Sequence, residues 1–157
     1  MLSSGYRGQG CAMGEDADLA ALLRVPLPTL HRVLGRSWQG RDDVLDGSPG
    51  RRWFASGEPL QVLLAVDDRR LVLARPVGVR DGVAALRYEP VDPRAFACDD
   101  LRARPAALSA AARDITTRRR QSFRWCPTCR QLHPPEDFER SFQRCRTCRE
   151  LVDGVAS

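Results

Sequence analysis

The chain has 157 residues, of which 43% are hydrophobic but only 6% aromatic, so a core must be built mainly from leucine, valine and alanine. Its longest apolar run, residues 60–66, is less than half of the roughly 20 residues that a membrane helix needs. Residues 1–10 lack the apolar region of a secretory signal. We therefore expect a soluble, cytoplasmic protein.

The formal net charge of +5 is unevenly distributed along the chain. All 25 basic residues are arginine, a pattern typical of codon bias in a GC-rich genome, so their number alone is weak evidence for nucleic acid. Their placement says more: residues 1–100 carry 13 arginines and 14 acidic residues, whereas residues 101–157 carry 12 arginines and 6 acidic residues. A field concentrated in this way attracts polyanions. The alternative is a solvated basic face.

The N-terminal region predicts two short helices within residues 16–36, after a start at residues 1–15 that we expect to be disordered. Leucines at 19, 22 and 23 mark one face of the first helix. Pro26 ends it, because proline lacks an N–H and restricts the residue before it. The second helix can begin at Pro28. It places Leu30, Val33 and Leu34 inward and Thr29, His31, Arg32 and Arg36 outward.

This stretch resembles the bacterial helix-turn-helix motif. Arg24 stands where that motif usually has glycine in a strained turn, and the matching positions are Ala20, Val25, Thr29 and Leu30. The resemblance implies DNA binding, with the second helix in the major groove and Thr29, His31 and Arg32 nearest to bases or phosphates. The alternative is an ordinary helical hairpin packed onto the rest of the protein.

The middle of the chain predicts a small sheet. Residues 37–52 are rich in Gly, Asp, Ser and Pro, which indicates a linker or long loop. Residues 53–122 contain three apolar runs separated by turn signals at Asp67-Asp68 and Asp81-Gly82, which predicts a three-stranded antiparallel meander. A helix from Pro105 to about Gln121 would cover the sheet, using an apolar stripe of Leu108, Ala111, Ala112 and Ile115.

The predicted covering helix ends in three consecutive arginines, Arg118, Arg119 and Arg120. One interpretation is a phosphate-binding patch that continues into the C-terminal segment, through Arg124, Arg130, Arg144 and Arg146. The other is that cations in the last turn complement the helix dipole.

Four cysteines near the end of the chain, Cys126, Cys129, Cys145 and Cys148, form two C-x-x-C pairs separated by fifteen residues. In an intracellular chain this spacing favours metal over disulfides, because each pair can turn two thiolates toward one ion and complete the tetrahedron of zinc. Iron–sulfur is the remaining option. We expect Trp125, Phe138 and Phe142 to pack around the site, and His133 to lie at the surface or beside the ligands.

The segment WCPTCRQLHPPEDFERSFQRCRTCRE resembles the zinc-ribbon modules of bacterial and phage proteins, including those that precede the HNH segment of phage recombination endonucleases. Pro134, Phe138 and Arg149 occupy matching places. Only LVDGVAS follows Glu150, so the resemblance implies a zinc ribbon at residues 123–157 without nuclease activity.

The expected fold class is α+β: an N-terminal helical hairpin, a small antiparallel β-meander with a covering helix, and a C-terminal zinc ribbon. No enzyme is expected, since the chain lacks lysine for a P-loop and its acidic pairs lie in turns. Four thiolates would saturate the zinc, making it structural. The favoured function is nucleic-acid binding, with DNA as ligand and regulation as one option. The alternative is a protein–protein adaptor. Neither requires a membrane or a small-molecule substrate.

Overall fold

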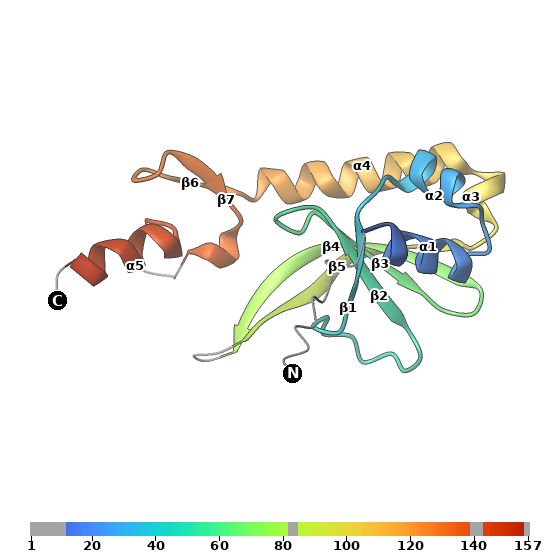
Figure 1. The fold of residues 1–157 in the computed structure, drawn as a ribbon, viewed down its shortest axis with the longest axis horizontal. Coiled ribbons are helices and arrows are strands. Elements are labelled where there is room, and N and C mark those ends of the chain that lie inside the picture. Colours follow the sequence, from blue (N-terminus) through green and yellow to red (C-terminus); the bar gives the residue numbers. More distant parts are fainter. Residues whose placement is uncertain (1–11, 82–84, 139–142, 156–157) are drawn as a thin grey trace, which may run out of the picture.

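The computed structural model describes residues 12–81, 85–138 and 143–155 (Figure 1). The fold is α+β, as predicted, and none of its described helices is both long and apolar enough to cross a membrane. The helices are α1 (Ala12–Leu22), α2 (Leu27–Leu34), α3 (Asp100–Ala103), α4 (Pro105–Gln121), the short 3-10 helix η1 (Pro135–Asp137) and α5 (Arg146–Val155). The strands are β1 (Trp38–Arg41), β2 (Arg52–Ser56), β3 (Val62–Val66), β4 (Arg70–Asp81), β5 (Ala85–Ala97), β6 (Arg124–Cys126) and β7 (Gln131–His133).

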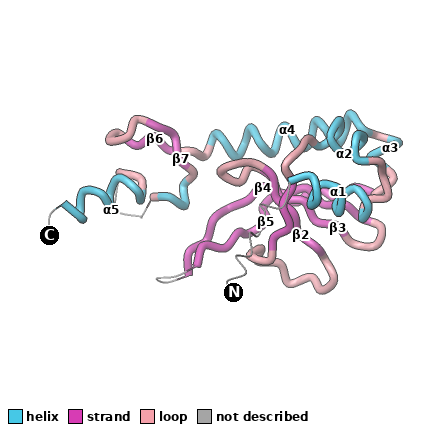
Figure 2. Tube along the Cα trace, in the orientation of Figure 1, coloured by secondary structure: helices cyan, strands magenta, loops and turns pink. Residues whose placement is uncertain are grey.

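Strands β1 to β5 form one antiparallel sheet in chain order (Figure 2). The predicted turn at Asp67 is confirmed, since its Oδ1 accepts the backbone N–H groups of Arg69 and Arg70 at 3.3 and 2.9 Å. The turn expected at Asp81-Gly82 includes residues outside the described ranges. A bulge between Leu73 and Arg75 interrupts the pairing of β4 with β5, and bulges bend the strands that carry them.

The two edges of this sheet meet at one point. The backbone N–H of Leu45, just after β1, donates to the carbonyl of Tyr88 in β5 at 2.7 Å. The N–H of Tyr88 in turn donates to the carbonyl of Asp43 at 3.0 Å. Val44 thus forms a parallel bridge with Tyr88. The sheet is therefore curled into a partly closed barrel.

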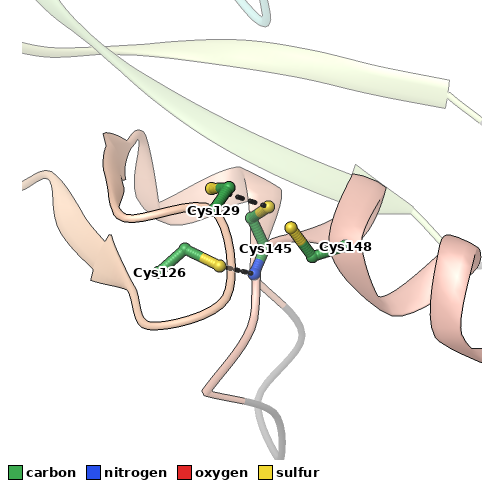
Figure 3. Close-up of side chains that lie close together, drawn as sticks. All are labelled: Cys126, Cys129, Cys145 and Cys148. Atoms are coloured by element: carbon green, nitrogen blue, oxygen red, sulfur yellow. Dashed lines mark hydrogen bonds between the residues drawn. The ribbon is translucent and has the colours of Figure 1, made fainter.

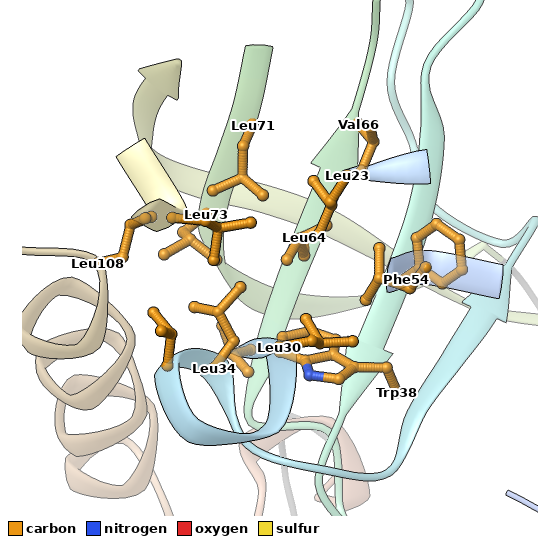
Figure 4. Packing of buried hydrophobic residues seen from close by; sticks show 14 of the residues in the cluster. Leu23, Leu30, Leu34, Trp38, Phe54, Leu64, Val66, Leu71, Leu73 and Leu108 are labelled. Atoms are coloured by element: carbon orange, nitrogen blue, oxygen red, sulfur yellow. The ribbon is translucent and has the colours of Figure 1, made fainter. Parts of the chain in front are cut away.

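Both faces of the sheet are buried, which explains why all five residues of β3 are apolar and inaccessible. Helices α1, α2, α3 and α4 contribute to the core on one face, where Trp38, Phe54, Leu64 and Leu73 of the sheet meet helical leucines (Figure 4). The core residues of the other face are Trp53, Ala55, Leu60, Leu63, Ala65, Val72, Ala74 and Tyr88. Burying a leucine side chain stabilises the fold by about 1.5–3 kcal/mol, and leucine is the most frequent residue in the first of these clusters.

Three expectations from the sequence need correction in this part of the fold. Helix α1 begins at Ala12, so residues 12–15 are helical rather than disordered, and residues 1–11 lie outside the described chain. The expected linker 37–52 contains β1, whose Trp38 is 0% exposed. The sheet has five strands rather than three, because β1 and β2 precede the three predicted strands. The helical hairpin packs onto the rest of the protein, as its alternative interpretation expected, because Leu19 and Leu30 belong to the same core cluster as Leu108.

Asp16 fixes the connection from α2 into β1. Its buried carboxylate accepts the backbone N–H of Ser37 at 3.1 Å and that of Trp38 at 2.7 Å, and it lies 2.9 Å from Nε2 of His31. These hydrogen bonds to both carboxylate oxygens offset the free-energy cost of burying the charge of Asp16. This one carboxylate joins α1, α2 and the start of the sheet.

Candidate metal centre and neighbouring basic groove

The four predicted metal ligands come together from two segments of the C-terminal module (Figure 3). Cys126 ends β6 and Cys129 lies in the turn before β7, so a two-stranded hairpin holds the first pair. Cys145 directly precedes α5, and Cys148 lies in its first turn. The hairpin turn requires a left-handed backbone at Arg130, with φ 57°, and its N–H donates to the Cys126 carbonyl at 2.9 Å.

The geometry of the thiols is compatible with one tetrahedral zinc ion. All four Sγ atoms lie within 4.8 Å of one another, and those of Cys129 and Cys145 are 4.0 Å apart. A zinc ion bound at about 2.3 Å from each sulfur would separate the sulfurs by about 3.8 Å. Cys126, Cys145 and Cys148 are buried, while Cys129 is half-buried. The backbone N–H of Cys145 also donates to Sγ of Cys126 at 3.4 Å.

The pKa values of these thiols diverge in the absence of a cation. Burial opposes ionisation of Cys126, but hydrogen bonds from the backbone of Cys129, Cys145 and Thr128 outweigh it and lower the pKa of Cys126 to about 5. Burial raises the pKa of Cys129. Burial and hydrogen bonding with the neighbouring thiols raise the pKa of Cys148 to about 12. A bound divalent cation favours the thiolate form of every ligand. A divalent cation bound by this cluster would therefore displace protons from its thiols.

His133 lies beside the thiols, in agreement with its interpretation as a neighbouring group. Its Nε2 is 3.1 Å from Sγ of Cys129, and its Nδ1 is 3.7 Å from Oδ2 of Asp137. A ring N–H that donates to a ligating thiolate stabilises its charge, and a carboxylate on the other side orients the ring. The residues present can therefore hold zinc with four sulfur ligands and support one ligand through His133.

The packing around the cluster differs from the expectation in one respect. Phe138 is buried against the cysteines, and the guanidinium of Arg124 lies 4.4 Å from the centre of its ring. Trp125, in contrast, is 56% exposed and does not pack there. Phe142 lies outside the described residues.

The module is attached to the barrel through a buried ion pair that the sequence did not single out. Arg119 at the end of α4 binds both carboxylate oxygens of Glu136 in η1, one of them at 3.1 Å, and its Nε donates to the Leu60 carbonyl at 2.9 Å. Arg80 of β4 donates to the Glu136 carbonyl at 3.1 Å. The side chain of Glu136 also lies over Gly78, where an added Cβ would be 2.5 Å from it. This contact leaves no room for another residue at 78.

The six residues predicted to contact nucleic acid fall into different environments. On α2, Thr29 is half-buried, His31 faces Asp16 instead of solvent, and Arg32 is exposed. At the end of α4, Arg118 pairs with Asp114 at 3.1 Å and Arg120 is exposed, with its Nε 3.3 Å from the side-chain oxygen of Gln61. Arg119 is buried in the pair with Glu136. The expectation that Arg119 belongs to a surface cluster is therefore corrected.

The structure brings Arg32 and Arg120 together in one groove. This groove of about 690 Å³ runs between α2 and α4 along the loop after β2, and Arg113 lines it as well. Its lining includes serine, threonine and glutamine side chains but no aspartate or glutamate. In the described part of the chain, no carboxylate pairs with any of the three arginines. Sequence reasoning missed Arg113, although it lies between Ala112 and Ile115 of the apolar stripe of α4 and seven positions before Arg120.

Comparisons with known proteins add no family to this description. No protein-family model matches the chain, no curated protein matches its sequence, and no solved structure matches its fold.

Proposed function

We propose that the protein binds nucleic acid, with DNA as the first ligand to test, and that its zinc site is structural rather than catalytic. The observation that carries the proposal is the groove between α2 and α4. Three arginines line it and no carboxylate does. A concave surface of one charge sign focuses its field on a passing polyanion.

The chemistry of the groove favours contacts to phosphates. Arginine donates two parallel hydrogen bonds to a phosphate, and serine and threonine hydroxyls donate as well. The groove offers all three types of donor, with Thr116 and Thr117 on α4 beside Arg113 and Arg120. A ligand in this groove would therefore be recognised by its backbone rather than by its sequence.

The arrangement of α2 supports the same conclusion. A helix that reads bases directs several free side chains into the major groove. Here Thr29 is half-buried and His31 faces the buried Asp16, so Arg32 is the exposed polar side chain that α2 offers after its first turn, and Arg36 is exposed just beyond the helix. We therefore propose phosphate contacts from α2, without sequence-specific reading by Thr29 or His31.

In this proposal the zinc site stabilises the C-terminal part of the protein and takes part in no reaction. Four thiolates saturate zinc and leave no position for a reactive water. The ion would fix the hairpin and α5 in place, as structural zinc does in other small modules. Regulation of a nucleic-acid process is compatible with such a binding protein, whereas catalysis forms no part of the proposal.

The proposal is tested by a salt series with the zinc-loaded protein. Binding of a fluorescent DNA duplex is measured by anisotropy from low to moderate salt, for the natural chain and for a variant with Arg32→Gln, Arg113→Gln and Arg120→Gln. Each lost phosphate contact lowers the slope of log affinity against log salt by about 0.9. Three contacts correspond to a loss of roughly 500-fold at 0.1 M salt, relative to 1 M salt.

A matched control removes the same charge elsewhere. Arg69, Arg70 and Arg87 are exposed and lie outside the groove, so their glutamine variant has the same net charge as the groove variant. We expect this control to retain most of the affinity and the salt slope. Equal losses in both triple variants would mean that only net charge matters. Absence of duplex binding even at low salt would favour the protein-adaptor alternative.

A further inference from the structure

The β6–β7 hairpin presents an exposed apolar pair that belongs to none of the core clusters of the described residues. Trp125 and Leu132 are directly opposite one another in the register of the two strands. They are 56% and 60% exposed, although their neighbours include the buried Cys126. The other two tryptophans of the chain, Trp38 and Trp53, are 0% and 7% exposed. Trp125 is therefore the one exposed indole.

We propose that Trp125, supported by Leu132, is a stacking platform for an unpaired base, and that the preferred ligand is single-stranded nucleic acid. This inference rests on the proposed function and narrows its ligand class. An indole face stacks on any base, and such stacking is tolerant of sequence. Bases in a duplex are stacked on one another, so a side chain on a surface hairpin reaches only those of a single strand.

The charge around the pair argues for a polyanion rather than for an apolar protein segment. The hairpin and its turn, residues 124–133, contain two arginines and no acidic residue. Arg130 is exposed in the turn, and Arg120 is exposed at the end of the preceding helix. The arginines do not attract an apolar protein partner, whereas they attract each phosphate beside a stacked base.

The platform lies within reach of the groove. Arg120 lines the groove and stands five positions before Trp125, so their Cα atoms are at most about 18 Å apart even along an extended chain. A single strand that leaves the groove at Arg120 would pass the hairpin next. Binding sites of single-strand-binding folds start at about four nucleotides, which is compatible with a path over both features.

The hairpin is suited to this role because the metal site holds it. Cys126 and Cys129 lie at the end of β6 and in the following turn, on either side of the metal position. The hairpin is fixed before a ligand arrives, so little conformational entropy is lost when a base stacks on Trp125.

The test uses zinc-loaded protein, a fluorescently labelled oligo(dT) of about 15 nucleotides, and a labelled duplex of the same length. Trp125→Ala is expected to weaken binding of oligo(dT) by about 5- to 150-fold, the loss seen when one stacked base is released. Its effect on duplex binding should be under twofold. Trp125→Phe keeps an aromatic face and is expected to retain most of the affinity. Leu151→Ala removes a 64% exposed apolar side chain from α5 and serves as the matched control.

Intrinsic fluorescence provides a second measurement that needs no variant. Because Trp38 and Trp53 are buried, quenching of exposed tryptophan emission by acrylamide reports on Trp125, and oligo(dT) should protect it. Unchanged oligo(dT) affinity in Trp125→Ala, with affinity lost in the groove variant, would overturn the platform and leave the proposed function standing. Absence of binding to both oligonucleotides would overturn the platform together with the proposed function. Conversion of a dimer to a monomer by Trp125→Ala, with unchanged oligo(dT) affinity, would assign the pair to self-association and also overturn it.

Discussion

Replacing Glu136 by glutamine should be among the most destabilising single changes of a polar side chain in this protein. The side chains of Arg119 and Glu136 are 2% and 3% exposed, and the carboxylate of Glu136 is the counter-ion of the guanidinium. Glutamine has nearly the same size and shape, so it creates no cavity. It leaves the buried guanidinium with the Leu60 carbonyl and a neutral amide as its partners, and one amide N–H₂ group must face other donors.

The magnitude follows from the burial of the pair. Removing one partner of a buried ion pair costs about 3–5 kcal/mol, because the remaining charge is left uncompensated. For a chain of this length, each kcal/mol lowers Tm by about 2–4 °C. The Glu136→Gln variant should therefore unfold about 6–20 °C below the natural chain.

The assay is thermal and urea unfolding of zinc-loaded protein, with Asp114→Asn as control. That change is the same in chemistry, and Asp114 also binds two arginines, Arg94 and Arg118, but its side chain is 42% exposed. Exposed pairs contribute little, so the control should unfold close to the natural chain. The double variant Arg119→Met with Glu136→Leu removes both charges and should recover most of the loss. A loss no larger than that of the control, or a double variant no better than the single one, would refute this reasoning.

Three further predictions concern the metal site and the backbone. Zinc binding at pH 7 should release at least the two protons held by Cys129 and Cys148, whose pKa values are raised, so the affinity for zinc should rise about 100-fold per pH unit near neutrality. Calorimetry in buffers of different ionisation enthalpy measures the number of protons released. A release of no protons would contradict the prediction. Gly78→Ala should destabilise the protein by about 1–3 kcal/mol, because its Cβ would meet the side chain of Glu136; a neutral effect in urea unfolding would show that η1 moves freely. Arg24→Gly should raise stability by up to about 1 kcal/mol, since φ is 56° there, and a lower urea midpoint would count against this account.

Local patterns in the sequence predicted the parts of the structure that depend on near neighbours. The C-x-x-C spacing places the two thiols of each pair close together, and the loop between the pairs brings the second pair next to the first. Helix α4 runs from Pro105 to Gln121 as expected, because proline starts it and its apolar stripe continues for about two turns. The strands β3, β4 and β5 contain apolar runs, and the aspartate turn at Asp67 separates the first two of them. Each of these features is defined within a short window.

Features that depend on distant partners could not be predicted in this way. Strand β1 is four residues long and includes Gly40, so its sequence resembles a loop until it pairs with β2. Arg119 has the same residue type as its neighbours Arg118 and Arg120, so residue type did not distinguish it. Its partner Glu136 lies in the C-terminal module, outside the local sequence window. One local signal was available: Arg119 follows Ile115 by four positions, which places it on the buried face of α4. The composition of the run concealed this periodicity.

The bridge between Val44 and Tyr88 has a consequence for how partners can engage the barrel. Many proteins are captured when a foreign peptide lines up along an open sheet and completes its ladder of main-chain hydrogen bonds. At Tyr88 the N–H and carbonyl that such a peptide would need are already bonded to Asp43 and Leu45 of the same chain. The other edge strand of the sheet, β1, is only four residues long, and short edge strands discourage the addition of a foreign strand. Self-pairing at Tyr88 therefore interrupts the free edge of β5, so a partner strand cannot pair along its whole length.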